Sequence, residues 1–439
     1  MFKETSKELL DFLSKSPTAF HAVENYRQIL NADGFKELLE SEHWDIVPGG
    51  KYYVTRNNTS ILAFKVGTKL DNYSFNIVTS HTDSPTFKVK ENAEIEVKNK
   101  YTQLNTEGYG GMLCATWLDR PLSIAGRVLV SEGNSIVTKL LNIDRDLLMI
   151  PNVAIHMNRA ANDGFKYNLQ VDMLPLLSAG DDRQKDFKQI IADELGVKKE
   201  DILGHDLYLY NRMAPSIWGA NEEFISAGHL DDLQCGFASL KALLAGYNDE
   251  SIDIMACFDN EEVGSGTKQG ADSTLLRDTL VRINSALGKT EEDYHRALAS
   301  SFMLSSDNAH AVHPNHPEHT DVTNCTYMNE GVVVKSHAGQ KYTSDGVSMA
   351  VVKSLASGAD VPLQYFANRS DKAGGSTLGN IAMAQASMNA VDIGLPQLAM
   401  HSSYETAGIK DTYYAISLMK ALFDSHIQET STHSLEIKR

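Results

Sequence analysis

The pattern of apolar and polar positions divides the chain into segments with different predicted secondary structure. Near the start, apolar residues recur at helical spacing over Lys3–Ser14 and Ala19–Asn31, with Pro17 between the two predicted helices. Short β-rich runs follow at 52–55, 60–65 and 74–79. From about Thr86 to Ile217 the chain shows short alternating runs such as FKVKENAEIEV, which are typical of a separate β-rich segment.

After Trp218 the pattern changes to helices that alternate with strands. The predicted helices are 233–246, 274–287, 376–390 and 412–423, and the predicted strands are 252–258, 302–306, 331–335, 362–366 and 397–401. This alternation predicts an α/β fold with a mostly parallel central sheet flanked by helices. We therefore expect a discontinuous α/β domain, residues 1–86 and 218–439, interrupted by an inserted β-rich domain, residues 87–217.

Charge and cysteine usage narrow the classes of function. The chain has 439 residues and a formal net charge of −17, so it repels phosphate backbones and anionic lipid surfaces. Its 4 cysteines form no CxxC pair, which favours reduced thiols. No stretch approaches the roughly 18 uninterrupted apolar residues of a membrane span. We expect a soluble cytoplasmic protein that binds neither nucleic acid nor membrane.

Residues of metal-binding type follow four of the predicted strands. In an open α/β sheet, reactive groups gather where strands end at their carboxyl edge. The residues after these strands are His81 and Asp83, then Asp259, Glu261 and Glu262, then Asp307 and His310, and finally His401. Because residues of this type follow all four strands, the sequence predicts a metal centre at this edge of the sheet.

A fifth candidate position lies at the predicted start of the helix 233–246. Asp231, or its neighbour Asp232, could bridge two divalent ions held by two histidines and two further carboxylates. In His81-Thr82-Asp83 the first and third side chains point the same way along a strand. Asp83 can therefore accept a hydrogen bond from one imidazole N–H of His81 while the other imidazole nitrogen binds metal. Adjacent glutamates allow one ligand and one general base.

Eight segments together resemble the M18 metallopeptidases, the aspartyl aminopeptidase family. They are SPTAFHAV near the start, SHTDSP at 80–85, IPNVAIHMNR at 150–159, SAGHLDDL at 226–233, FDNEEVGS at 258–265, SSDNAHAVHPN at 305–315, GGSTLGNI at 374–381 and MHSSYE at 400–405. The resemblance runs almost from end to end. It implies an aminopeptidase that acts on peptides with a free N-terminus.

The resemblance also implies a site with two divalent ions per subunit, usually zinc, although cobalt or manganese suits the same ligands. The residues matching its ligands are His81 and Asp307 for one ion, Glu262 and His401 for the other, and Asp231 as the bridge. Glu261 then acts as general base on the water that the metals activate, and Asp83 orients His81.

Further implications concern assembly and specificity. Family members are dodecamers built from dimers, with the inserted domain used for dimerisation, and the residue matching His156 reaches the active site of a neighbouring subunit. A preference for N-terminal Asp or Glu requires a cation in the pocket. The match points to Lys335, with Lys341 as a rival.

Alternatives remain open. A different dinuclear amidase or a carboxypeptidase could use a similar ligand set, and a non-catalytic assembly or cargo protein could keep the fold, although such a protein has no need of Glu261. Histidines recur every three residues at 310, 313, 316 and 319. Pro314 and Pro317 exclude a regular helix there, so we expect a plain loop for His316 and His319. The other two fall inside the family motif and could line the site.

Overall fold

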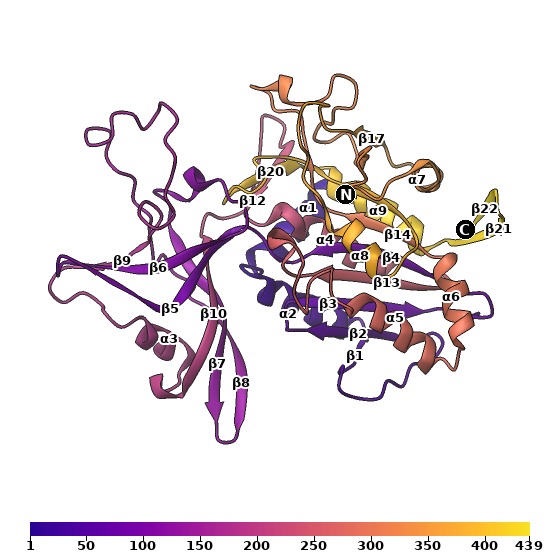
Figure 1. The fold of residues 1–439 in the computed structure, drawn as a ribbon, viewed down its shortest axis with the longest axis horizontal. Helices are drawn as coiled ribbons and strands as arrows, with labels where there is room; N and C mark the ends of the chain where they lie inside the picture. Colours follow the sequence, from indigo (N-terminus) through magenta and orange to yellow (C-terminus); the bar gives the residue numbers. More distant parts are fainter.

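Two separate bodies, each built on its own sheet, organise the chain (Figure 1). The structure is a computed structural model that describes residues 1–439. Both termini lie in the larger body, which contains a nine-stranded sheet, and the smaller body contains a six-stranded sheet. None of the helices combines the length and the apolar character needed to cross a membrane.

The large sheet has the α/β architecture that the sequence predicts. In spatial order its strands are β1 (Lys36–Glu37), β2 (Lys51–Arg56), β3 (Ser60–Val66), β13 (Ser251–Phe258), β4 (Ser74–His81), β14 (Phe302–Ser306), β18 (Asn389–Gly394), β16 (Val332–Lys335) and β17 (Leu363–Phe366). The central strands β13, β4, β14 and β18 are parallel. β3, β4 and β13 are buried along their whole length, as expected of strands covered on both faces.

Helices cover both faces of this sheet. One face packs against α1 (Phe2–Ser14), α2 (Ala19–Ala32), α4 (Leu230–Ala245), α7 (Gly346–Gly358) and α9 (Asp411–Phe423). The other packs against α5 (Leu275–Ala286), α6 (Glu291–Ala299) and α8 (Leu378–Gln385). Successive side chains of a strand point to opposite faces, so Ile61 of β3 joins the first core and Leu62 joins the second. The result is a three-layer α/β fold, and the predicted fold class is confirmed.

The smaller body is an antiparallel sheet with its own core. Its strands lie in the order β8 (Ser135–Asn142), β7 (Leu122–Glu132), β10 (Ile202–Asn211), β5 (Thr86–Val97), β6 (Tyr101–Tyr109) and β9 (Leu176–Ala179). α3 (Phe187–Leu195) contributes to the core, which includes Phe87, Trp117 and Leu207. No named helix or strand lies within residues 143–175, and this segment takes part only in isolated β-bridges.

A five-stranded sheet lies beside the large one and carries His401. Its strands are β11 (Ser216–Trp218), β12 (Phe224–Ala227), β20 (Glu405–Gly408), β19 (Pro396–Leu398) and β15 (Ala309–His310). The chain ends in a hairpin of β21 (His426–Ser431) and β22 (Ser434–Lys438). Four short 3-10 helices complete the structure: Cys114–Trp117, Lys199–Asp201, Glu261–Val263 and Pro317–His319.

Two predicted elements are wrong in extent. The helix expected over 376–390 ends at Gln385, and Asn389–Gly394 forms the central strand β18 instead. The Ala- and Met-rich sequence favours helix locally, but the place beside β14 is filled by a strand, and tertiary pairing overrides propensity. The strand expected over 397–401 stops at Leu398, and His401 follows in a turn with a φ of 66°. The helices α6 and α7 are absent from the prediction.

Candidate metal centre

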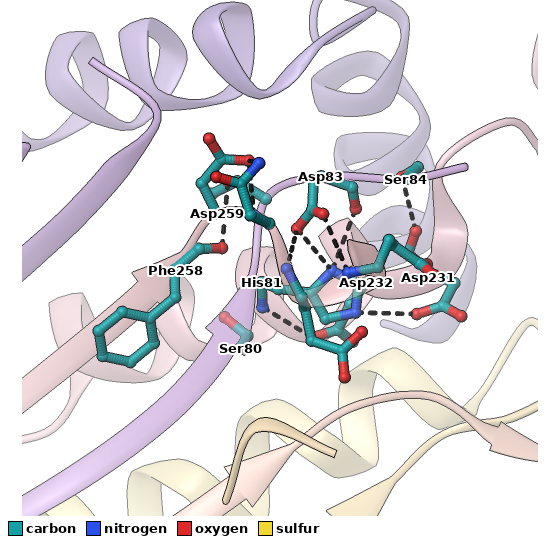
Figure 2. Close-up of polar contacts among 12 residues, drawn as sticks. Ser80, His81, Asp83, Ser84, Asp231, Asp232, Phe258 and Asp259 are labelled. Carbon is teal, nitrogen blue, oxygen red and sulfur yellow. Dashed lines mark hydrogen bonds and ion pairs between the residues drawn. The ribbon is translucent and has the colours of Figure 1, made fainter. Parts of the chain in front are cut away.

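Three neighbouring strands bring the predicted residues to one edge of the large sheet. β13, β4 and β14 lie side by side and parallel, so their carboxyl ends meet. His81 is the last residue of β4, Asp307 follows β14 directly, and Glu261 and Glu262 begin the 3-10 helix after β13. Figure 2 shows His81, Asp83, Asp231 and Asp232 converging here.

His81 is buried and has a carboxylate on each side. Its Nδ1 lies 3.0 Å from the backbone oxygen of Asp83, which suits a donated hydrogen bond. Its Nε2 lies 3.3 Å from Oδ1 of Asp231 and 3.7 Å from Oδ1 of Asp307. Burial opposes protonation of this imidazole, but hydrogen bonds to the three carboxylates raise its pKa well above the ordinary value. A cation is therefore favoured at this position.

His401 forms a second group on the opposite side of Asp231. Its Nε2 lies 3.4 Å from Oε2 of Glu262 and 3.7 Å from Oδ2 of Asp231. Its Nδ1 lies 2.9 Å from the backbone oxygen of Gly111, so the ring is held from the side of the smaller body. The two oxygens of Asp231 thus face His81 and His401 respectively, the arrangement that a bridging ligand requires.

The structure distinguishes the two candidate aspartates at the start of α4. Asp232 accepts a hydrogen bond of 3.1 Å at Oδ2 from the backbone N–H of His81, so this carboxylate supports the end of β4. The Asp231 carboxylate points to the histidines, and the backbone N–H of Asp231 donates a hydrogen bond to Glu405. Of the two, Asp231 is the residue whose carboxylate oxygens face both histidines.

Asp83 holds the glutamate pair as well as the histidine. Its Oδ1 and Oδ2 accept the backbone N–H groups of Glu261 and Glu262, each at 3.1 Å. Tyr109 of β6 donates its hydroxyl to Oδ2 at 2.7 Å. The carboxylate lies 3.4 Å from Nδ1 of His81, farther than the backbone oxygen. Asp83 therefore fixes the turn that carries the expected general base.

Glu405 was assigned no role in the sequence prediction. This buried side chain accepts hydrogen bonds from the backbone N–H of Asp231 at 3.0 Å and from that of His401 at 2.8 Å. It therefore ties the start of α4, which carries Asp231, to the turn before β20, which carries His401. Its position at the end of the motif MHSSYE was the available signal, but the contact depends on the packing of β20 beside α4.

Buried negative charge gives the centre its affinity for cations. Burial, followed by the charge of Asp231, raises the pKa of Glu262 well above its ordinary value, and burial with nearby carboxylates raises that of Glu261 to about 8. Burial also acts on Asp307, but the Lys335 ammonium and a neighbouring imidazole hold its pKa low. Oε1 of Glu262 is buried without a hydrogen-bond partner. Imidazoles and carboxylates around such oxygens fit divalent zinc.

Lys335 is buried beside the metal centre. Its Nζ donates to the backbone oxygen of Asn308 at 2.8 Å and lies 3.5 Å from Oδ2 of Asp307. Gly394 packs against this region, because an added Cβ there would clash with the backbone oxygen of Asp307 and lie 2.9 Å from Cε of Lys335. Lys341 instead donates to a backbone oxygen at Gly374.

Three predicted histidines lie outside the ligand groups, although His310 is near enough to the centre that, besides burial, the charges of Asp231 and Asp307 act on its pKa. His156 is exposed in the long segment 143–175. His310 and His313 are not among the donors that converge within 4.8 Å at the centre. The structure thus brings together the five expected ligands, Glu261 and Asp83, and leaves His156 at the surface of the smaller body.

Comparisons with known proteins agree with this site. The family described as aminopeptidase I zinc metalloprotease (M18) matches residues 12–423. A probable M18 family aminopeptidase 2 of Clostridium novyi is 48% identical over 425 residues, 95% of this chain and 98% of that protein. A chain in the cryo-EM structure of the Ape4 and Nbr1 complex superposes with a TM-score of 0.92 at 35% identity, covering 96% of this chain and 86% of that one.

A second solved structure extends the agreement to a multisubunit relative. The S. cerevisiae mApe1 dodecamer matches with a TM-score of 0.84 at 28% identity, covering 96% of this chain and 97% of that one. The family match spans nearly the whole chain, including both bodies of the structure. The chain therefore belongs to the M18 family of zinc metallo-aminopeptidases, hydrolases that release the N-terminal residue of a peptide.

Proposed function

We propose that this aminopeptidase prefers peptides with N-terminal Asp or Glu and works with two divalent ions and Glu261 as general base. One observation carries the dinuclear part of the proposal. The two carboxylate oxygens of Asp231 lie 3.3 Å and 3.7 Å from Nε2 of His81 and of His401. A carboxylate shared between two imidazoles suits two adjacent cations better than one.

The remaining ligands divide between the two halves of the centre. His81 and Asp307 would hold one ion, and Glu262 and His401 the other, with Asp231 bridging. This set accepts zinc, and cobalt or manganese fits it as well. When bound, the ions would polarise the scissile carbonyl and make water nucleophilic at neutral pH.

Glu261 supplies the proton transfers. Its backbone is fixed by Asp83 and its side chain is not among the five ligands, so it is free to take a proton from the attacking water and deliver it to the leaving amine. The burial that raises its pKa to about 8 makes its carboxylate a stronger base than an exposed glutamate. The peptide's free α-amine would be drawn to the same acidic site.

Acidic specificity is assigned to Lys335. This ammonium lies at the end of β16 beside Asp307, which places positive charge next to the expected metal centre. A carboxylate in the substrate's first side chain would be attracted to it. Lys341 donates instead to a backbone oxygen on the loop around Gly374, which favours Lys335 as the determinant.

Assembly into a homo-oligomer, a dodecamer built from dimers, is the second part of the proposal. The segment 143–175 of the inserted domain exposes large apolar side chains, namely Val153, Ile155, Met157, Phe165, Leu169 and Val171. Gathered apolar exposure of this kind marks protein interfaces. His156 lies in the middle of this segment, so docking against another subunit would carry it to a neighbour's active site.

The domain division and the compartment follow from the same proposal. Residues 1–86 and 218–439 would form the catalytic domain, and residues 87–217 the dimerisation domain. All 4 cysteines are free thiols, which suits a reducing cytoplasm.

Matched peptides test the proposal. The protein is assayed for release of N-terminal Asp, Glu, Leu and Lys from peptides that are otherwise identical, each also prepared with an acetylated N-terminus. The proposal predicts fastest release of Asp or Glu and no cleavage of acetylated peptides. Cleavage that instead requires a free C-terminal carboxylate would indicate a carboxypeptidase, and cleavage of none would indicate a non-catalytic assembly protein.

A further inference from the structure

The loop after β15 brings three metal-binding side chains together at the surface, in a group separate from the ligand groups of the buried centre. His316, Glu318 and His319 each offer a ligand atom, and these atoms lie within 4.8 Å of one another. They follow the segment 305–315 through which the chain resembles its family, and none of them belongs to the ligand set of the buried centre.

A turn and the short 3-10 helix Pro317–His319 create this cluster. The backbone N–H of His316 donates to the oxygen of His313 at 3.0 Å, and that of His319 donates to the oxygen of His316 at 3.2 Å. The rings of His316 and His319 therefore stack, with centroids 5.4 Å apart. The expectation of a plain loop is therefore wrong for this segment, because Pro317–His319 forms a short 3-10 helix and the histidine side chains stack.

Local contacts fix the cluster to the body of the protein. Arg369 donates to the backbone oxygen of Glu318, and its guanidinium is itself held by Asp371 at 2.9 Å. Within the cluster, Nδ1 of His316 lies 3.1 Å from Oε1 of Glu318. The donors thus project from an anchored backbone, while their side chains stay about half exposed and free to turn.

We propose that His316, Glu318 and His319 form a peripheral site for a divalent transition metal of the Zn²⁺ class. Two imidazoles and one carboxylate are the ligand types of zinc sites, and water can complete a tetrahedron. Zn–N bonds of about 2.0–2.1 Å require donors nearer to one another than 4.8 Å, and rotation of exposed side chains closes that gap. Mg²⁺ and Ca²⁺ are disfavoured because they take oxygen ligands.

Equilibrium dialysis of the full chain against a series of free Zn²⁺ concentrations tests this site. We expect the wild-type protein to hold one zinc per subunit more than the His316→Ala/His319→Ala double variant, whatever number of ions the buried centre binds. Glu318→Gln should keep the two imidazoles and weaken the additional binding about tenfold, and dialysis against Mg²⁺ should show no difference between wild type and variants.

His295→Ala provides the matched control. This exposed histidine on α6 lies 3.8 Å from Glu291 and has no third donor, so its loss should leave the zinc content unchanged. Circular dichroism verifies that each variant is folded. Equal zinc content in wild type and double variant at every concentration would overturn the proposal, as would an equal loss in His295→Ala.

Discussion

The hydroxyl of Tyr109 donates a 2.7 Å hydrogen bond to Oδ2 of Asp83, and in this way the smaller body reaches the catalytic turn. The same hydroxyl accepts a hydrogen bond of 2.7 Å from Nδ2 of Asn260, next to Glu261. Two residues after Tyr109, the backbone oxygen of Gly111 lies 2.9 Å from Nδ1 of His401. The smaller body therefore contacts both groups of candidate metal ligands, in addition to any role in assembly.

Tyr109→Phe should lower kcat without removing metal. The variant deletes one hydrogen bond to a carboxylate, an interaction that contributes about 1.5–3 kcal/mol, so we expect kcat to fall about 10- to 100-fold. Kinetics and metal content are measured together. Tyr208→Phe is the control, because this ring packs against Tyr109 with centroids 5.7 Å apart and makes no hydrogen bond to Asp83. Unchanged kcat in Tyr109→Phe would show that the contact is dispensable.

Glu405→Gln should weaken metal binding. Glutamine can accept only one of the two backbone hydrogen bonds from Asp231 and His401, and loss of support behind metal ligands reduces affinity about 10- to 100-fold. Chelator competition measures the change. Asp411→Asn is a matched control, since Asp411 is also buried and accepts two backbone N–H groups, but lies outside the centre. Equal metal affinity in wild type and Glu405→Gln contradicts this role.

Lys335→Met should change the order of substrates as well as the rate. If the ammonium attracts the substrate's side chain, kcat/KM falls by a larger factor for peptides starting with Asp or Glu than for those starting with Leu. A lysine that only pairs with Asp307 would instead give the same loss for all of them. The ratio of kcat/KM values decides between the two, and Lys341→Met should leave that ratio unchanged.

Acidification should destabilise the protein partly through His21. Burial lowers the pKa of this imidazole from 6.5 to about 4, and Nδ1 lies 2.8 Å from the hydroxyl of Thr18. Between about pH 4 and pH 6.5 the His21 imidazole is protonated in the unfolded chain and neutral in the folded chain. The contribution is therefore complete above pH 6.5 and is lost as the pH falls toward 4.

His21→Gln isolates that contribution. The difference in thermal unfolding temperature between wild type and variant should shrink on going from pH 7 to pH 5, because the variant has no group that titrates at this position. A difference that stays constant, or grows, over this range would be inconsistent with a buried neutral imidazole.

Much of the fold and of the ligand set was predictable because it follows from local patterns. β4, β13 and β14 are short β-rich runs that are buried along their length, and parallel strands bring His81, Glu262 and Asp307 to one edge. β18 was missed because the predicted helix was extended over its first two residues, Asn389 and Ala390, and its pairing with β14 is a tertiary contact.

The supporting residues could not be predicted in the same way. Glu405 and Tyr109 act through contacts between elements far apart in the chain, at separations of 174 residues to Asp231 and 26 residues to Asp83. No spacing or periodicity reports such contacts. The stacked rings of His316 and His319 were hidden for a related reason, since a turn and a short 3-10 helix, not a regular α-helix, align them.

The most direct test of the proposed mechanism is Glu261→Gln, assayed on Asp, Glu, Leu and Lys peptides with bound metal quantified in the same samples. The variant keeps all five expected ligands and loses only the proton acceptor. The proposed mechanism predicts full metal content at the buried centre and kcat reduced by at least about 10²- to 10⁴-fold on every peptide, the usual contribution of a general base. A metal-replete variant that cleaves at the wild-type rate would contradict it.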